Sequence, residues 1–336
     1  MTTERIVSYA QIGIANHGRT IVNGARDAGN LRLMSCFDIN LEANRQIAEE
    51  FHAFPASSYE EALNYAGVEA VVLVTPNHLH YEQLRLAVQA EKHLFVDKPI
   101  ANTVRESREM IAWAKQANLI LMVGHNTRRR QSFRRAKQLL DENRIGTVVA
   151  VEANLSRPAG LQAGLPAWKA DSATCPLLPM MQLGIHLVDT VEYLLDPIAT
   201  VSCIAANRAM KGSAYDTTTA LLQLESGIPV TLSSYYVSAD TYFLRIYGTA
   251  GTLHCFPTKL QLDLLENGMI KETITEEFNA EGAQSYILQM KEFGDCILHG
   301  KKPETGGPEG LRAVAVIEAM TASVEHRCMV QLEKIE

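Results

Sequence analysis

The chain has 336 residues, of which 47% are apolar and 21% are charged, proportions typical of a folded globular protein. A chain of this length is expected to form two domains rather than one. The formal net charge is −7, and the longest run of like charge is the arginine triplet at 128–130. A nucleic-acid-binding protein would normally carry a basic face, so DNA and RNA are not expected partners.

The same composition argues against a membrane protein and against a metal site. No apolar run approaches the roughly 18 residues that a membrane-spanning helix needs, and the N-terminus lacks the pattern of a signal peptide. The six cysteines are scattered, with no C-x-x-C pair and no histidine at a zinc-binding spacing. We therefore expect a cytoplasmic protein with free thiols, no membrane contact and no bound metal.

Residues 1–125 read as one domain in which apolar strands alternate with helices. Strands are predicted at 5–14, 31–39, 68–75, 92–97 and 119–125. Two of the helices between them have capping boxes at their starts, Ser58 with Glu61 and Thr103 with Glu106. Continuous apolar strands alternating with helices predict an α/β fold with a doubly wound parallel sheet.

Residues 126–336 have a different pattern and are predicted to form a second α/β domain. A helix near 132–143 is followed by a strand near 147–155, a loop rich in Pro, Gly and Ala at 156–179, and an apolar helix. Several alternating runs between 200 and 256 then follow without helices between them, and two helices near 284–298 and 308–325 come last. Successive strands of this kind predict a large, mostly antiparallel sheet with one open face.

The end of the first strand carries a candidate dinucleotide-binding loop. Gly13, Ala15 and Gly18 form a G-x-A-x-x-G pattern, in which the small residues allow a tight turn and close approach of a pyrophosphate. Asp38 lies 20 residues beyond Gly18, at the end of the second strand, where a carboxylate can bind both hydroxyls of the adenine ribose. Because it would repel the extra phosphate of NADP, NAD is the favoured cofactor. The alternative is that Asp38 only caps the following helix.

Three more polar clusters follow later strands of the first domain. They are "TPNHLH" at 75–80, "DKP" at 97–99 and "GHNTRR" at 124–129. Each alone could be an ordinary loop. Since an open parallel sheet binds ligands at the carboxyl ends of its strands, three such clusters on one edge indicate a binding site.

The apolar helix of the second domain carries an unusual polar stripe. Gln182, His186 and Asp189 follow one another at spacings of four and three, which places them on one side of a helix. The rest of the run is apolar enough to be buried.

Together these motifs resemble the family of glucose–fructose oxidoreductase, inositol dehydrogenase and their relatives. The resemblance extends over nearly the whole chain and includes "YGTAGTL" at 247–253. It departs from the family in having D-K-P where most relatives have E-K-P, and Gln182 where the D-x-G-x-H-x-x-D motif has its first aspartate. The resemblance implies a Rossmann domain at 1–125 and a substrate-binding and oligomerisation domain at 126–336. It also implies dimers or tetramers formed through the open sheet.

The resemblance assigns a cofactor role to many of these residues. The loop would hold the pyrophosphate and Asp38 the ribose, while the strand-end clusters would line the rest of the cofactor. The implied cofactor-binding residues are Gly13, Ala15, Asn16, His17, Gly18, Asp38, Thr75, Asn77, His80, Asp97, Lys98 and Asn126.

The resemblance also places His186, Lys98 and Gln182 at the reacting hydroxyl. Histidine suits proton transfer because its ordinary pKa lies near 6.5. We expect His186 to carry the proton, Lys98 to stabilise the developing alkoxide, and Gln182, which cannot take a proton, to orient the substrate. Asp189 either orients the other ring nitrogen of His186 or is an ordinary helix aspartate.

Further substrate contacts are expected from Arg128, near the domain crevice of the family, and from Trp168 and Lys169 in the loop at 156–179. The alternatives are a packing role for Trp168 and a solvated role for the arginines. Tyr235, Tyr236 and His254 are expected to be core or interface residues, and His125 an ordinary residue at the end of a strand.

The expected function is an NAD-dependent oxidoreductase acting on a secondary alcohol or ketone of a sugar, a sugar derivative or a cyclic polyol. One alternative is a redox-neutral enzyme that cleaves a glycoside or eliminates a group while NAD is regenerated. Another is a non-catalytic sensor of NAD or sugar, which the substitution at Gln182 favours and the presence of Lys98 and His186 disfavours.

Overall fold

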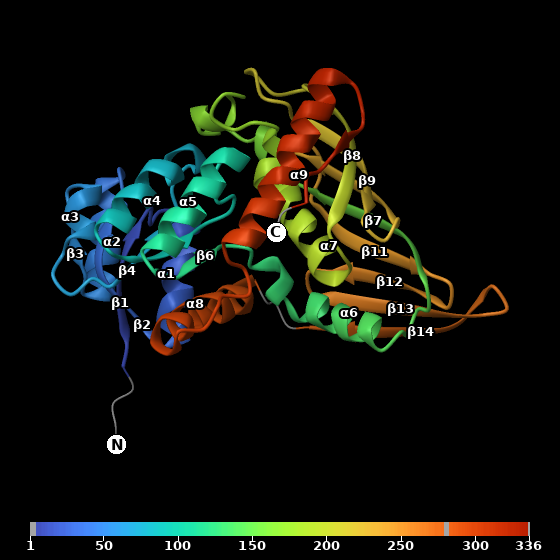
Figure 1. The fold of residues 1–336 in the computed structure, drawn as a ribbon, viewed down its shortest axis with the longest axis horizontal. Coiled ribbons are helices and arrows are strands. Elements are labelled where there is room, and N and C mark those ends of the chain that lie inside the picture. The colour runs from blue at the N-terminus through green and yellow to red at the C-terminus, as the bar shows by residue number, and fades with distance from the viewer. Residues whose placement is uncertain (1–4, 279–281, 335–336) are drawn as a thin grey trace. The chain divides into compact units, whose positions relative to one another are not determined.

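The computed structural model describes residues 5–278 and 282–334, which form two compact units (Figure 1). The first unit contains residues 5–126 and 282–311, and the second contains residues 127–278 and 312–334. The sequence assigns all of 126–336 to the second domain. The structure differs in the segment 282–311, which packs with the first unit.

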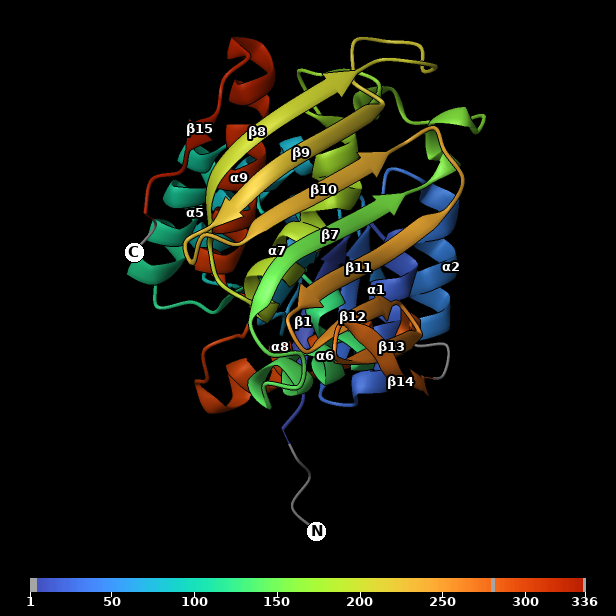
Figure 2. The same cartoon turned by 90° about the vertical axis from the view of Figure 1, so that its right-hand side faces the viewer.

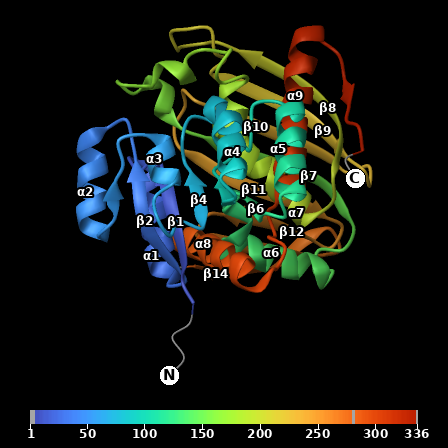
Figure 3. The same cartoon turned by 60° about the vertical axis from the view of Figure 1, so that its left-hand side comes forward.

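Among the described residues, six parallel strands form the sheet of the first unit, in the order β3-β2-β1-β4-β5-β6 (Figure 3). Their bounds are Val7–Ile12 (β1), Leu31–Phe37 (β2), Phe54–Pro55 (β3), Ala70–Leu73 (β4), His93–Val96 (β5) and Leu121–Val123 (β6). The predicted parallel, doubly wound sheet is confirmed. The short strand β3 was not predicted.

Helices connect these strands, as the alternating pattern indicates. Their bounds are His17–Ala28 (α1), Leu41–Phe51 (α2), Tyr59–Leu63 (α3), His80–Gln89 (α4) and Val104–Gln116 (α5), with a 3-10 turn η1 at Asn77–Leu79. The two predicted caps are confirmed: the side chain of Ser58 accepts a hydrogen bond from the N–H of Glu61, and that of Thr103 from the N–H of Glu106.

Helix α8 (Gly282–His299) packs on the first unit because its apolar face completes that core. Met290 and Phe293 are fully buried in the same cluster as residues of β1 and β2. At the contact with α1, a Cβ on Gly24 would lie 3.2 Å from Tyr286. A single glycine therefore lets the two helices approach closely, and this contact has no local signal in the sequence of α8.

Among the described residues, the second unit has a nine-stranded sheet in the order β14-β13-β12-β11-β7-β10-β9-β8-β15 (Figure 2). All neighbours pair antiparallel except β7 and β10, which confirms the mostly antiparallel sheet. The bounds are Val148–Ser156 (β7), Ile198–Ala206 (β8), Thr217–Leu224 (β9), Pro229–Tyr235 (β10), Thr241–Gly248 (β11), Gly251–Phe256 (β12), Lys259–Glu266 (β13), Met269–Glu277 (β14) and Val330–Gln331 (β15). Strands β13, β14 and β15 were not predicted.

Helices of the second unit cover one face of this sheet, and Figure 2 shows strands β8, β9, β10 and β7 in front of α7 and α9. The helices are α6 (Gln131–Asp141), α7 (Ile185–Leu194) and the part of α9 (Gly307–His326) from residue 312 onward. Three 3-10 turns, η2 (Thr127–Arg129), η3 (Pro158–Leu161) and η4 (Ala167–Lys169), lie outside the sheet. The predicted helix around residues 175–195 differs in its first part, because Met180–Gly184 is a π-helical segment, η5.

Two further expectations can be compared with the described residues. None of their helices is long and apolar enough to cross a membrane. The cysteines are free, and of these Cys328 is exposed while the others are buried.

Candidate functional site

In the first unit, the glycine-rich loop after β1 has the geometry that its pattern predicts. Gly13 has a φ of +79°, and a Cβ there would lie 2.3 Å from the carbonyl oxygen of Val74. A Cβ on Gly18 would lie 2.2 Å from the carbonyl oxygen of Gly13. Both positions therefore require glycine. Ala15 is half-buried and Asn16 is exposed, so the loop accepts larger residues between the two glycines.

Gln11, which was not predicted as a site residue, binds the carbonyl groups of this loop. Its side chain is fully buried in β1, and its Nε2 donates to the carbonyl oxygens of Gly18 at 2.8 Å and Gly13 at 3.2 Å. The signal in the sequence is an amide inside an otherwise apolar strand. Buried amides normally find partners, so such a residue predicts a bond to nearby backbone.

Asp38 binds the N–H groups of the same loop. Its Oδ2 accepts hydrogen bonds from the N–H groups of Ile14 at 2.7 Å and Ala15 at 3.0 Å, and its Oδ1 accepts one from Asn40 at 2.8 Å. The cap of α2 is Asn40, whose side chain accepts from the N–H of Ala43, so the capping alternative for Asp38 is wrong. A carboxylate offers about four acceptor positions, so one remains for a ligand.

The start of α1 and the end of β5 meet through His17 and Asp97. Nε2 of His17 lies 3.5 Å from Oδ1 of Asp97, whose side chain is mostly buried. Burial alone would raise the pKa of Asp97. The interactions of Asp97 with His17 and with the charge of Lys98 outweigh this effect and hold the pKa of Asp97 well below its usual range. Asp97 therefore stays ionised beside Lys98, which is half-buried and precedes a cis peptide bond to Pro99.

His80 joins two of the predicted strand-end clusters. Its buried ring places Nδ1 2.9 Å from the carbonyl oxygen of Pro99 and Nε2 2.9 Å from that of Thr75. Burial lowers the pKa of His80 and the charge of Asp97 opposes this effect. Both ring nitrogens thus face main-chain oxygens, and the predicted contact of His80 with a cofactor stays a prediction.

The other predicted cofactor residues of the first unit are held by neighbouring side chains. The hydroxyl of Thr75 donates to Oε1 of Gln83 at 2.6 Å, and Asn77 donates to Asn102. At the end of the first segment, Nδ2 of buried Asn126 donates to the hydroxyl of Ser285 in α8 at 2.9 Å. Their contacts with a cofactor stay predictions.

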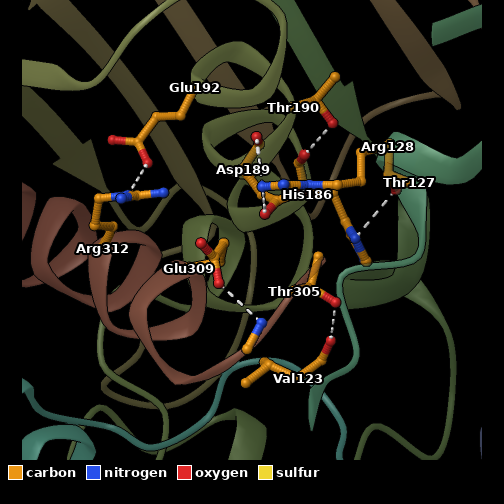
Figure 4. Close-up of polar contacts among 11 residues, drawn as sticks. Val123, Thr127, Arg128, His186, Asp189, Thr190, Glu192, Thr305, Glu309 and Arg312 are labelled. Carbon is orange, nitrogen blue, oxygen red and sulfur yellow. Dashed lines mark hydrogen bonds and ion pairs between the residues drawn. The ribbon is translucent and has the colours of Figure 1, made fainter. Parts of the chain in front are cut away.

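In the second unit, His186 is half-buried on α7 and is oriented by the turn η2. Its Nδ1 lies 3.3 Å from the hydroxyl oxygen of Thr127 (Figure 4). The hydroxyl of Tyr242 donates to the same oxygen at 3.5 Å. The hydroxyl of Thr190 donates to the carbonyl oxygen of His186 at 2.6 Å. This places Nδ1 of His186 against Thr127, and the contact of His186 with a substrate stays a prediction.

Asp189 forms a buried ion pair with Arg128. Nε and Nη2 of Arg128 donate to the two carboxylate oxygens at 3.0 and 2.5 Å, and both side chains are less than one tenth exposed (Figure 4). Tyr193 stacks under the same guanidinium, 5.1 Å from its ring centroid. The sequence offers two roles for Asp189, orientation of His186 or an ordinary helix aspartate, and neither includes the pairing with Arg128 that these bonds show. The substrate roles assigned to both residues stay predictions.

A second group of the predicted residues gathers around Cys175 and Tyr236. Nε2 of Gln182 donates to the sulfur of buried Cys175 at 3.7 Å. Nζ of Lys169 donates to the hydroxyl of Tyr236 at 3.4 Å and lies 5.3 Å from the ring centroid of Trp168. Tyr236 is buried, as expected for a core residue, and its hydroxyl accepts a hydrogen bond from Lys169.

A separate cavity of about 590 Å³ in the second unit is lined by other residues, among them Glu192 and Arg312. Burial raises the pKa of Glu192, and the bonds from the N–H of Ile198 and from Arg312 at 3.2 Å oppose this effect (Figure 4). None of the predicted site residues lines the cavity. Among the described residues, no group of three or more His, Cys, Asp or Glu side chains is placed to bind a metal ion.

Comparison with known families agrees with the fold of each half. Residues 7–125 match the model described as "Oxidoreductase family, NAD-binding Rossmann fold", and residues 133–254 match the "GFO/IDH/MocA C-terminal domain". The chain belongs to the Gfo/Idh/MocA oxidoreductase family. The resemblance drawn from the sequence motifs is therefore confirmed.

Relatives within this family have several activities. The chain is 24% identical to D-xylose 1-dehydrogenase [NADP(+)] of Haloarcula marismortui, over 98% of this chain and 94% of that protein. It is 25% identical to 2,7-anhydro-N-acetylneuraminate hydratase of Escherichia coli, over 98% of both chains. Levoglucosan dehydrogenase in complex with NADH and levoglucosan has the same fold, with a TM-score of 0.89 and 18% identity over 98% of this chain and 100% of that one.

Proposed function

We propose that this family member is an NAD-dependent oxidoreductase that moves a hydride between nicotinamide and a secondary alcohol or ketone of a sugar, a sugar derivative or a cyclic polyol. The observation that carries the proposal is that both halves match the oxidoreductase family while the chain retains Lys98 and His186. The xylose and levoglucosan dehydrogenases among its relatives support a sugar substrate.

The loop around Gly13 and Gly18 fits a pyrophosphate. Its tight turn leaves no room for a side chain at either glycine, and such a turn before a helix lets a pyrophosphate approach the backbone. When bound, the nicotinamide accepts or supplies the hydride. In this proposal His186 carries the hydroxyl proton, Lys98 stabilises the developing alkoxide, and Gln182 orients the sugar through hydrogen bonds. The alkoxide is stabilised best if the lysine stays charged, and ionised Asp97 beside it favours that state.

Replacing Lys98 by methionine tests these roles. Lys98→Met removes the charge but keeps most of the length of the side chain, so turnover should fall by about a hundredfold or more. Binding of NADH, followed by fluorescence titration, should change less than threefold. Retained turnover in a variant that still binds NADH would remove Lys98 from the reaction.

We also propose that NAD is preferred to NADP. Asp38 retains one acceptor position beside the loop, and its negative charge disfavours a 2′-phosphate. Because Asp38 also holds the loop, Asp38→Asn is a milder test than a change to arginine. The ratio of NADP to NAD affinity should rise by about tenfold. An unchanged ratio would show that Asp38 only shapes the loop.

A redox-neutral reaction is the second candidate, and the hydratase among the relatives favours it. Such an enzyme would oxidise and reduce its substrate within one turnover, so that NADH would not accumulate. Product analysis with a single equivalent of NAD distinguishes the two candidates, since a dehydrogenase would form at most one equivalent of product.

A further inference from the structure

Several arginines of the second unit differ in what binds them. Arg128 is paired with Asp189, and Arg135 and Arg245 pair with Glu276 and Glu152. Arg130 and Arg157 have no ion pair and no side-chain hydrogen bond within residues 5–278 and 282–334. The Nε of Arg130 is nevertheless buried. A buried donor without a partner is costly, so this guanidinium is suited to bind an anion.

Both arginines come close to Tyr242, the residue that bonds Thr127 beside His186, in chain position or in space. Arg157 directly follows Ser156, the last residue of β7, which pairs with Thr241 next to Tyr242. The guanidinium of Arg130 lies 5.8 Å from the centroid of the Tyr242 ring. Burial raises the pKa of Tyr242, and the positive charges of Arg130 and Arg157 oppose that rise. The Tyr242 hydroxyl is joined to His186 through the single side chain of Thr127, which places Arg130 close to His186.

Arg157 also connects this group to the cluster around Tyr236. Its backbone N–H donates to the carbonyl oxygen of Tyr235 at 2.9 Å, which fixes the residue beside β10. Burial raises the pKa of Tyr236 to about 12, and the charge of Arg157 opposes this rise too. The charge of Arg157 thus opposes the rise in pKa of two tyrosines, Tyr242, which bonds Thr127 beside His186, and Tyr236, which accepts a hydrogen bond from Lys169.

Nearby acidic side chains do not neutralise the two arginines. Asp216 is fully buried and accepts the N–H groups of residues 208–210. Asp240, in the turn before β11, is exposed and forms no ion pair within the described part of the chain. The position at which most relatives have an aspartate is occupied by Gln182.

We propose that Arg130 and Arg157 form an anion-binding subsite beside His186, and that the sugar substrate carries a carboxylate or a phosphate group. This inference rests on the proposed function, in which His186 lies at the reacting hydroxyl. The planar guanidinium groups suit either anion because each offers paired N–H donors. In this proposal Arg128 binds Asp189 of α7, whereas Arg130 binds the anionic group of the substrate.

The test measures binding by calorimetry to the full chain saturated with NADH, using sugars that differ in charge. Galactose is compared with galacturonate, and glucose with glucose 6-phosphate. One anionic member should bind at least tenfold more tightly than its neutral partner, and the pair that shows this identifies carboxylate or phosphate. Arg130→Gln and Arg157→Gln should each weaken that binding by about tenfold, which corresponds to about 1.4 kcal/mol.

Matched variants control for unfolding and for general loss of charge. Arg157→Lys should keep part of the affinity, and Arg144→Gln, at an exposed arginine of the same unit, should keep all of it. Thermal melting confirms that each variant is folded. The inference is overturned if no anionic sugar binds more tightly than its neutral partner, or if both glutamine variants bind it unchanged. Because binding requires no turnover, absence of hydride transfer would contradict only the proposed function.

Discussion

At the scale of single residues, the first unit shows how a binding loop is held before any ligand arrives. Gln11 bonds the carbonyl oxygens on one side of the loop and Asp38 bonds the N–H groups on the other. The role of the glycines could be predicted from their spacing alone. The role of Gln11 could not, because it depends on two carbonyl groups that only the folded loop brings within reach of its amide.

Replacing Gln11 by leucine should therefore affect the cofactor more than the fold. Gln11→Leu leaves the carbonyl groups of Gly13 and Gly18 without this donor, but it also removes the buried Oε1, which has no partner in the described structure. We expect stability to fall by only about 1 kcal/mol and the Kd for NADH to rise about tenfold. Chemical denaturation and fluorescence titration measure the two effects. Unchanged NADH affinity would mean that the loop keeps its shape without Gln11.

At the scale of elements, a buried ion pair of the second unit helps to fix α7. Arg128 on η2 donates hydrogen bonds to both carboxylate oxygens of Asp189 on α7, and His186 lies one turn before Asp189 on the same helix. The polar stripe could be predicted from the spacing of Gln182, His186 and Asp189. The partner of Asp189 could not, because Arg128 is 61 residues away in the sequence.

Replacing Arg128 alone should lower the free energy of unfolding more than replacing Arg128 and Asp189 together. Arg128→Met leaves the Asp189 carboxylate buried without its cation, at a cost of about 3–5 kcal/mol. The double variant Arg128→Met with Asp189→Leu should recover much of that loss, since buried ion pairs can often be replaced by apolar residues. Urea denaturation of both variants gives the coupling energy. Additive losses would show that the two side chains do not stabilise each other.

The elements that were not predicted share a physical reason. Strand β14 has mostly exposed residues and no apolar face, and β3 and β15 contain two residues each. Their hydrogen bonds come from pairing with neighbouring strands rather than from a local pattern. Helix α8 was predicted as a helix, but its place in the first unit depends on packing against α1, which no local pattern encodes.

At the scale of the whole molecule, the open face of the large sheet is the surface we propose for self-association. Ile204 on β8 is 77% exposed and Leu221 on β9 is 53% exposed. Each lies next in its strand to one of the paired residues Cys203 and Ala220, which are buried, so both point to the uncovered face. Exposed apolar residues on a broad sheet face are typical of an interface between subunits.

Lysine at both positions should separate the subunits. In a symmetric dimer, Ile204→Lys with Leu221→Lys would place like charges across the interface. Light scattering should then give the mass of a single chain of 37.1 kDa for the variant and a multiple of it for the wild type. Met269→Lys, at an exposed residue of β14, serves as the control and should leave the mass unchanged. A wild type that is already monomeric would contradict the proposed assembly.

Hydride transfer between NAD and a sugar with the help of Lys98 is the activity that we propose for this chain. The most direct measurement is the absorbance of reduced nicotinamide when purified protein is mixed with NAD and a panel of neutral sugars, sugar acids, sugar phosphates and inositols, beside Lys98→Met. We predict that NADH accumulates with at least one member of the panel in the wild type and with none in the variant. Equal accumulation in both proteins would contradict the role of Lys98. Bound NAD that is reduced by no member of the panel would contradict the proposed hydride transfer.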